Sequence, residues 1–191
     1  MFLEQFPSER RQNGWVEVIC GSMFSGKTEE LIRRMKRAQF ANQKMLLFKP
    51  IIDDRYHATN IVSHQGTSIQ AIPVQDSSEI IKSWTDEKVI AIDEAQFFDK
   101  GLVAVCNQLS DKGVRVIIAG LDMDYLGVPF GPMPELLAIA EYVTKVHAIC
   151  VSCGNLAHYS HRISHEEGQV VVGAVEKYQP LCRTCYTKIN D

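Results

Sequence analysis

The stretch GWVEVICGSMFSGKT, residues 14–28, decides the fold of this 191-residue chain. Its apolar first half, residues 15–20, predicts a β-strand. Its second half, residues 21–28, fits the phosphate-loop pattern G-x-x-x-x-G-K-[ST] at every fixed position. Glycines let successive backbone N–H groups face one anion, and the helix that follows adds the positive end of its dipole. The order of strand, loop and helix therefore predicts nucleotide binding rather than a chance glycine-rich turn.

Every residue of this loop is a candidate for holding the phosphates of a nucleotide. The amine of Lys27 can reach the β and γ phosphates, and the hydroxyl of Thr28 can coordinate magnesium. The remaining candidates contribute mainly through the backbone: Gly21, Ser22, Met23, Phe24, Ser25 and Gly26.

A second motif, VIAIDEAQ at residues 89–96, supplies acidic groups. Its apolar run predicts a buried parallel strand, and ligands bind at the carboxyl ends of such strands. Asp93 would hold magnesium beside Thr28, and Glu94 can accept a proton from an attacking hydroxyl. Ala95 and Gln96 of the same motif are also candidates for binding the nucleotide. The alternatives are a helix-capping acidic pair or a helicase-like ATPase, which needs two such domains and a basic groove.

The rest of the pattern alternates strands with helices, which predicts an α/β fold with a parallel sheet and right-handed crossovers. We expect a P-loop, RecA-like sheet flanked by helices, followed by a small C-terminal domain. Its predicted strands are residues 15–20, 44–48, 89–92, 114–120 and 143–149, and its helices are 27–41, 76–84, 101–111 and 135–140. Short alternating runs fall at 60–63 and 68–72, and a loop at 121–134. The predicted division is a flexible segment at 1–13, a P-loop α/β domain at 14–145 and a cysteine-bearing domain at 146–191.

Composition narrows the class of protein. The apolar fraction is 46%, the charged fraction 23% and the net charge −3, so nothing global favours nucleic acid or an anionic membrane. No long apolar stretch or signal-peptide pattern is seen, which predicts a cytoplasmic protein.

Four of the six cysteines form two C-x-x-C pairs: Cys150 with Cys153, and Cys182 with Cys185. Four thiolates from two such turns predict a closed, structural zinc site. Redox or free cysteines are the alternative. Cys20 and Cys106 lie in apolar runs and are predicted core residues.

The polar loop after the second strand carries two further candidates. Arg55 could neutralise charge on a transferring phosphoryl group, and Asp53 could assist the metal. Plain loop residues are the alternative for both.

In combination, these motifs resemble the thymidine kinase family of the bacterial and animal-cytosolic type. The matching pieces span nearly the whole chain from about residue 14 onward: GSMFSGKT (21–28), KPIIDDRY (49–56), AIDEAQFF (91–98), GLDMDYLGVPFGPMP (120–134), the two C-x-x-C pairs and VVVGAVEKYQPLCRTCY (170–186).

The resemblance implies transfer of the γ-phosphoryl group of ATP to the 5′-hydroxyl of thymidine. It assigns Glu94 as the general base, with Lys27 and Arg55 as the other catalytic residues, and Asp53 near the phosphates. Met23 and Tyr125 would flank the thymine ring, where the family often has Phe in place of Tyr125. Residues 170–178 match the family's lasso loop, which is anchored by zinc and reads the base through backbone groups. Its candidate residues are Val170, Val171, Val172, Gly173, Ala174 and Tyr178.

The resemblance also implies a homotetramer inhibited by thymidine triphosphate, with ATP, Mg²⁺ and structural Zn²⁺ as cofactors and no membrane or nucleic-acid partner. The competing hypothesis is a non-catalytic P-loop and zinc-ribbon protein that binds nucleic acid.

Overall fold

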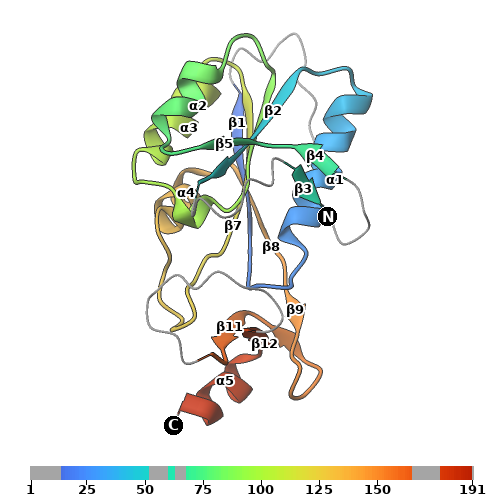
Figure 1. The fold of residues 1–191 in the computed structure, drawn as a ribbon, viewed down its shortest axis with the longest axis vertical. Coiled ribbons are helices and arrows are strands. Elements are labelled where there is room, and N and C mark those ends of the chain that lie inside the picture. The colour runs from blue at the N-terminus through green and yellow to red at the C-terminus, as the bar shows by residue number, and fades with distance from the viewer. Residues whose placement is uncertain (1–13, 52–59, 63–67, 165–176, 191) are drawn as a thin grey trace.

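The computed structural model describes residues 14–51, 60–62, 68–164 and 177–190. Its centre is a six-stranded sheet (Figure 1). The strands are β1 (Trp15–Cys20), β2 (Met45–Pro50), β5 (Ile72–Val74), β6 (Val89–Ile92), β7 (Arg115–Gly120) and β8 (Tyr142–Lys145). They lie in the order β5-β2-β6-β7-β1-β8, and each neighbouring pair is parallel. The predicted parallel α/β sheet is confirmed.

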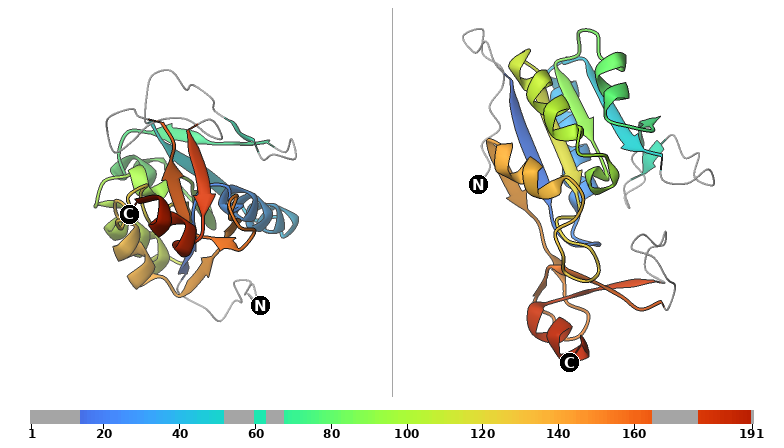
Figure 2. Two further views of the ribbon diagram at one scale, coloured as in Figure 1. Left: turned by 90° about the horizontal axis from the view of Figure 1, so that it is seen from below. Right: turned by 90° about the vertical axis from the view of Figure 1, so that its left-hand side faces the viewer.

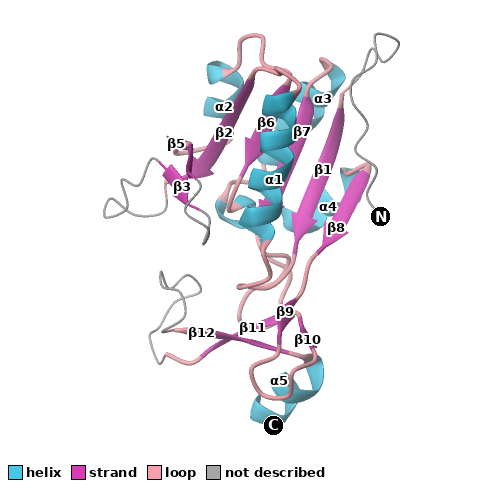
Figure 3. Ribbon diagram, turned by 90° about the vertical axis from the view of Figure 1, so that its right-hand side faces the viewer, coloured by secondary structure: helices cyan, strands magenta, loops and turns pink. Residues whose placement is uncertain are grey.

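Helices cover both faces of this sheet (Figures 1 and 3). Helix α1 (Lys27–Phe40) packs on one face. Helices α2 (Ser78–Ser83), α3 (Leu102–Asp111) and α4 (Met133–Ile139) lie on the other. Side chains alternate across a strand, so Val16 and Val18 of β1 enter the α3 side, whereas Ile19 enters the α1 side. None of the described helices has the length and apolar character needed to cross a bilayer.

The C-terminal part lies beyond the carboxyl ends of the sheet strands (Figures 2 and 3). It consists of two antiparallel ribbons, β9 (Ala148–Ile149) with β10 (Leu156–Ala157) and β11 (Tyr159–Arg162) with β12 (Tyr178–Leu181), followed by helix α5 (Arg183–Asn190). Its small core contains Ala148, Cys150, Ala157, Leu181 and Cys182. The sequence predicts short strands and loops for this part, so the strands agree with the prediction, whereas helix α5 is not predicted.

Two predicted strands are divided in the structure. The predicted strand at 143–149 is β8 and β9, because the chain leaves the sheet after Val146, whose N–H donates to the carbonyl of Cys20 at 2.8 Å. The run at 68–72 contains β4 (Ser68–Gln70), which pairs with β3 (Asn60–Val62) in a separate ribbon. Its last residue, Ile72, begins β5 of the main sheet.

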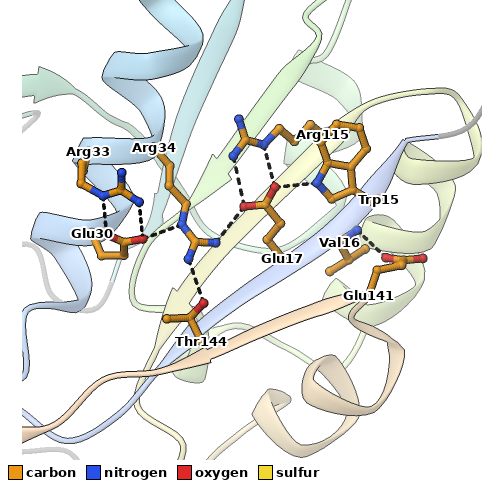
Figure 4. A network of polar contacts seen from close by, with 9 residues as sticks. All are labelled: Trp15, Val16, Glu17, Glu30, Arg33, Arg34, Arg115, Glu141 and Thr144. Carbon is orange, nitrogen blue, oxygen red and sulfur yellow. Dashed lines mark hydrogen bonds and ion pairs between the residues drawn. The ribbon is translucent and has the colours of Figure 1, made fainter. Parts of the chain in front are cut away.

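A buried ion network ties α1 to the sheet (Figure 4). The carboxylate of Glu17 accepts hydrogen bonds from Arg34 Nη1 at 2.8 Å, from Arg115 Nε at 2.7 Å and from Trp15 Nε1 at 2.5 Å. Arg34 Nη2 also donates to Thr144 Oγ1 at 2.9 Å. Glu17 and Arg34 are fully buried, and Arg115 is 1% exposed. One carboxylate therefore joins β1, α1 and β7, while Arg34 reaches β8.

Removing this carboxylate charge should destabilise the protein strongly. Glu17→Gln leaves two buried guanidinium groups without their shared anion, and breaking buried pairs in this way costs about 3–5 kcal/mol. The free energy of unfolding, measured by urea denaturation, should fall by that amount. The matched control is Asp86→Asn, which breaks the exposed pair with Lys44 and should change stability little. Equal stability of the two variants would contradict the importance of the network.

Candidate functional site

The phosphate loop lies between β1 and α1 and has the backbone form that the sequence predicts. Gly26 adopts φ +85°, in the left-handed region that favours glycine. At Gly21 a Cβ atom would lie 2.2 Å from the carbonyl oxygen of Val146, so a side chain cannot fit there. The hydroxyl of Ser25 donates to the carbonyl of Ser22 at 2.7 Å, which closes the turn. The loop therefore holds its backbone close to the sheet edge.

Lys27 begins α1 and turns back over the loop. Its Nζ donates to the carbonyl of Ser22 at 2.8 Å. Burial lowers the pKa of Lys27, and the carboxylates of Glu94 and Asp93 oppose this. A partly buried cation at the phosphate loop, next to the N-terminus of α1, suits an anionic ligand.

Thr28 and Asp93 meet across the gap between α1 and β6. Thr28 Oγ1 donates to Asp93 Oδ2 at 3.2 Å, and Asp93 is 4% exposed. Burial, and then the neighbouring charge of Glu94, raise the pKa of Asp93 to about 7. A divalent cation would counter both effects, and a carboxylate beside a hydroxyl offers the oxygen ligands that magnesium prefers. The residues present thus fit a magnesium ion.

Glu94 follows Asp93 in a strained conformation. It adopts φ +53° and ψ +41°, a region that a non-glycine residue rarely occupies. Its N–H donates to Asp93 Oδ1 at 2.9 Å, and its Oε2 accepts from Gln96 Nε2 at 2.5 Å. The charge of Glu94 also reaches Lys27. Strain of this kind concentrates at functional sites, because the surrounding structure must maintain it.

The last two residues of the DEAQ motif are buried. They belong to the 3₁₀ helix η1 (Ala95–Phe97). Ala95 is fully buried in the core on the α3 side. Gln96 is 2% exposed, and its amide bonds to Glu94 at one end and to the N–H of Leu121 at the other.

Strand β11 lies next to three residues that are predicted to bind the nucleoside: Met23, Tyr125 and Tyr178. The N–H of Met23 donates to Ser160 Oγ at 3.0 Å. The guanidinium of Arg162 lies 3.5 Å from the ring centre of Tyr125, and Arg162 pairs with Tyr178 across the β11–β12 ribbon. The structure therefore places Met23, Tyr125 and Tyr178 around one strand of the C-terminal part.

Three residues at this junction escape the sequence analysis: Ser160, Arg162 and Tyr186. The hydroxyl of Tyr186 donates to the carbonyl of Tyr125 at 2.8 Å, which fixes the loop between β7 and α4. Nothing in the local pattern YSHR at 159–162 marks these side chains, because their partners lie far away in the chain. Asp53, Arg55 and residues 170–174 lie outside the described residues, and their predicted roles stay predictions.

The four paired cysteines converge at one point. The Sγ atoms of Cys150, Cys153, Cys182 and Cys185 all lie within 4.8 Å of one another, and those of Cys153 and Cys182 are 3.6 Å apart. Tetrahedral zinc with Zn–S bonds of about 2.3 Å requires S···S separations of about 3.8 Å. The cluster thus fits a four-thiolate metal site. Cys20 and Cys106 are buried core residues, as predicted.

Comparisons with known proteins agree with this geometry. A family model described as thymidine kinase matches residues 14–186. The thymidine kinase of Bacteroides fragilis (strain YCH46) is 58% identical over 188 residues, which are 98% of this chain and 94% of that protein. The thymidine kinase of Porphyromonas gingivalis (strain W83) is 55% identical over 98% of this chain and 92% of that protein.

More distant structures add little. The solved structure of the Legionella pneumophila ATPase DotB aligns with a TM-score of 0.40 and 16% identity, over 68% of this chain and 35% of that chain. The sequence matches, by contrast, cover the phosphate loop, the acidic strand end and the cysteine cluster in one continuous alignment. The chain belongs to the thymidine kinase family.

Proposed function

We propose that this protein transfers the γ-phosphoryl group of ATP to the 5′-hydroxyl of thymidine, giving thymidine monophosphate. The observation that supports this most is the family match over residues 14–186, because that range contains the phosphate loop, the acidic strand end and the two C-x-x-C pairs. The phosphate loop follows β1 and the acidic pair follows β6, both at the carboxyl end of the sheet, which is the end next to the C-terminal part (Figure 3). This arrangement supports adjacent binding places for the donor and the acceptor.

The residues that would bind ATP, the phosphoryl donor, belong to the phosphate loop and the segments next to it. Backbone amides of residues 21–28 would bind the phosphates, and Lys27 would exchange its bond to Ser22 for one to a phosphate oxygen. Thr28 and Asp93 would hold Mg²⁺, which supplies charge neutralisation when bound. By resemblance, Asp53 and Arg55 would complete this side.

Glu94 would take the proton from the 5′-hydroxyl as that oxygen attacks the γ-phosphorus. Its place next to Asp93 puts the base beside the metal, at the carboxyl end of β6. The proton would move to the carboxylate of Glu94, and the β–γ bridging oxygen would leave with the departing ADP and keep the electron pair of the broken P–O bond. Lys27 would stabilise the negative charge that develops on the phosphates.

The acceptor side would be formed by Met23, Tyr125 and Tyr178 around the thymine, with residues 170–174 reading its polar edge. An aromatic face such as that of Tyr125 suits base stacking. The cysteine cluster flanks this segment on both sides in the sequence, so a bound zinc would restrain it. A homotetramer and inhibition by thymidine triphosphate are further expectations from the family resemblance.

Replacing the proposed base should slow turnover strongly. Glu94→Gln should lower kcat for thymidine phosphorylation by about 10²- to 10⁴-fold, because the amide cannot accept the proton. ATP affinity should remain close to the wild-type value. The matched control is Glu135→Gln on the exposed side of α4, which should retain full activity. Phosphorylation can be measured with thymidine, deoxyuridine and deoxycytidine in parallel.

Two results would contradict this proposal. Near-normal activity of Glu94→Gln would remove this residue from its role. A wild-type protein that prefers deoxycytidine, or that phosphorylates no nucleoside and instead binds single-stranded DNA in a salt-sensitive way, would overturn the assignment of the substrate.

The cysteine cluster should bind about one zinc ion per chain. Cys153→Ser should lose that metal and lower thymidine affinity, because the ends of the lasso segment are released. Cys106→Ala is the matched control, since it removes a core thiol and should retain the metal. Elemental analysis of the purified proteins measures the zinc content. Full zinc occupancy in Cys153→Ser would contradict a site with four cysteine ligands.

A further inference from the structure

We propose that Gln96 is a positioning residue that holds the carboxylate of Glu94 in the orientation needed to accept the proton. This inference rests on the proposed function, in which Glu94 is the general base. It differs from a nucleotide-binding role, which the DEAQ motif suggests from the sequence alone.

The side-chain amide of Gln96 is used at both ends. Its Nε2 donates to Glu94 Oε2 at 2.5 Å, and its Oε1 accepts from the N–H of Leu121 at 2.9 Å. A backbone N–H can only donate, so the amide oxygen must face Leu121. The amide nitrogen must then face Glu94, where a carboxylate can accept its proton. The orientation of the amide is thus fixed by chemistry.

The surroundings leave Gln96 no room to move. It is 2% exposed. A Cβ atom on Gly120 would lie 3.0 Å from Gln96 Oε1 and 2.6 Å from the sulfur of Met133. A Cβ atom on Gly131, which has φ +53°, would lie 2.1 Å from the carbonyl oxygen of Gln96. Gly120 thus lets its backbone approach the side-chain oxygen of Gln96, and Gly131 approaches the backbone carbonyl of Gln96, so the residue is closely packed at both its side chain and its backbone.

Glu94 needs such a partner for two reasons. Its backbone is in the left-handed region, and its long side chain has several rotatable bonds. In addition, Lys27 is close enough for the two charges to interact, so a free carboxylate could form an ion pair with it. The hydrogen bond from Gln96 to Glu94 Oε2 limits these side-chain rotations. A general base must be held within hydrogen-bond reach of the proton it removes.

The same residue links the base to the nucleoside side. Leu121 begins the loop that follows β7 and carries Tyr125. Gln96 therefore sets the position of Glu94 relative to this loop. An error in this spacing would affect the reaction rate more than the binding of either substrate.

A double-mutant cycle tests this directly. The variants are Glu94→Gln, Gln96→Met and the double variant, compared with the wild-type full-length protein. Gln96→Met should lower kcat by about 10- to 100-fold, with KM for thymidine and ATP within about threefold of the wild-type values. In the Glu94→Gln background the same change should alter the residual rate by less than about twofold, because Gln96 acts through Glu94.

A further variant tests the hydrogen bond to Glu94 separately from the one to Leu121. It also replaces Gln96→Met in the experiment if that variant does not fold. Gln96→Glu keeps an acceptor for Leu121 but replaces the amide donor to Glu94 with a carboxylate, whose like charge should displace the Glu94 carboxylate. Its kcat should also fall at least about 10-fold. The matched control is Gln108→Glu on the exposed side of α3, which adds the same charge and should retain full activity. Thermal unfolding establishes that each variant is folded.

Three outcomes would overturn the proposal. In the first, folded Gln96→Met or Gln96→Glu has near-normal kcat. In the second, Gln96→Met lowers the rate by the same factor in both backgrounds, as a merely structural residue would. In the third, the wild-type protein phosphorylates no nucleoside, which overturns the proposed function as well. If the wild-type protein prefers a different nucleoside, only the substrate assignment fails, and the cycle is measured with that acceptor.

Discussion

The buried carboxylate of Glu17 is the interaction on which the geometry of the site depends. It lies in β1, which leads into the phosphate loop, and it pairs with Arg34 of α1 and Arg115 of β7, while Glu30 supplies a second carboxylate to Arg34. Helix α1 begins with Lys27 and Thr28, and β7 ends at the loop that carries Tyr125. One charge therefore fixes the relative positions of the elements that would hold the donor and the acceptor. Because unpairing buried charges is costly, this arrangement resists distortion when ligands bind.

The second constraint acts between the sheet and the C-terminal part. Ser160 bonds to the backbone of Met23, while Arg162 and Tyr186 contact Tyr125 (Ser160 and Arg162 from β11, Tyr186 from α5). These contacts join the phosphate loop to a unit whose small core includes two of the metal-site cysteines. A metal bound there would stiffen the unit and, through it, the surface that faces the phosphate loop. The cysteine cluster, although remote in sequence from residues 21–28, can therefore influence the surface next to the phosphate loop.

Local patterns carried most of what could be predicted from the sequence. The phosphate loop, the strand before Asp93 and the two C-x-x-C pairs each have a short signature whose physics is local, and the structure brings their parts together as expected. The departure of the chain from the sheet after Val146 could not be predicted, because Ala148 and Ile149 pair instead with Leu156 and Ala157 in a separate ribbon. The pairing of Glu17 with Arg34 and Arg115 could not be predicted either, because it joins residues that lie 17 and 98 positions apart in the chain. The parts of the predicted site at 52–59 and 165–176 lie outside the described residues and stay predictions.

The DEAQ motif shows why a residue's role cannot be predicted from its motif alone. In the sequence, Asp93, Glu94 and Gln96 form one polar cluster beside a strand end, and all three suggest a bound nucleotide. In the structure the three residues have different surroundings. Asp93 accepts a hydrogen bond from Thr28, the backbone of Glu94 is in the left-handed region, and Gln96 accepts a hydrogen bond from the backbone of Leu121 after β7. The left-handed backbone conformation of Glu94 turns the chain sharply, so the side chains of Asp93, Glu94 and Gln96 point in different directions. Strain persists where neighbours compensate for it, and the buried amide of Gln96 is the neighbour in direct contact with the Glu94 carboxylate.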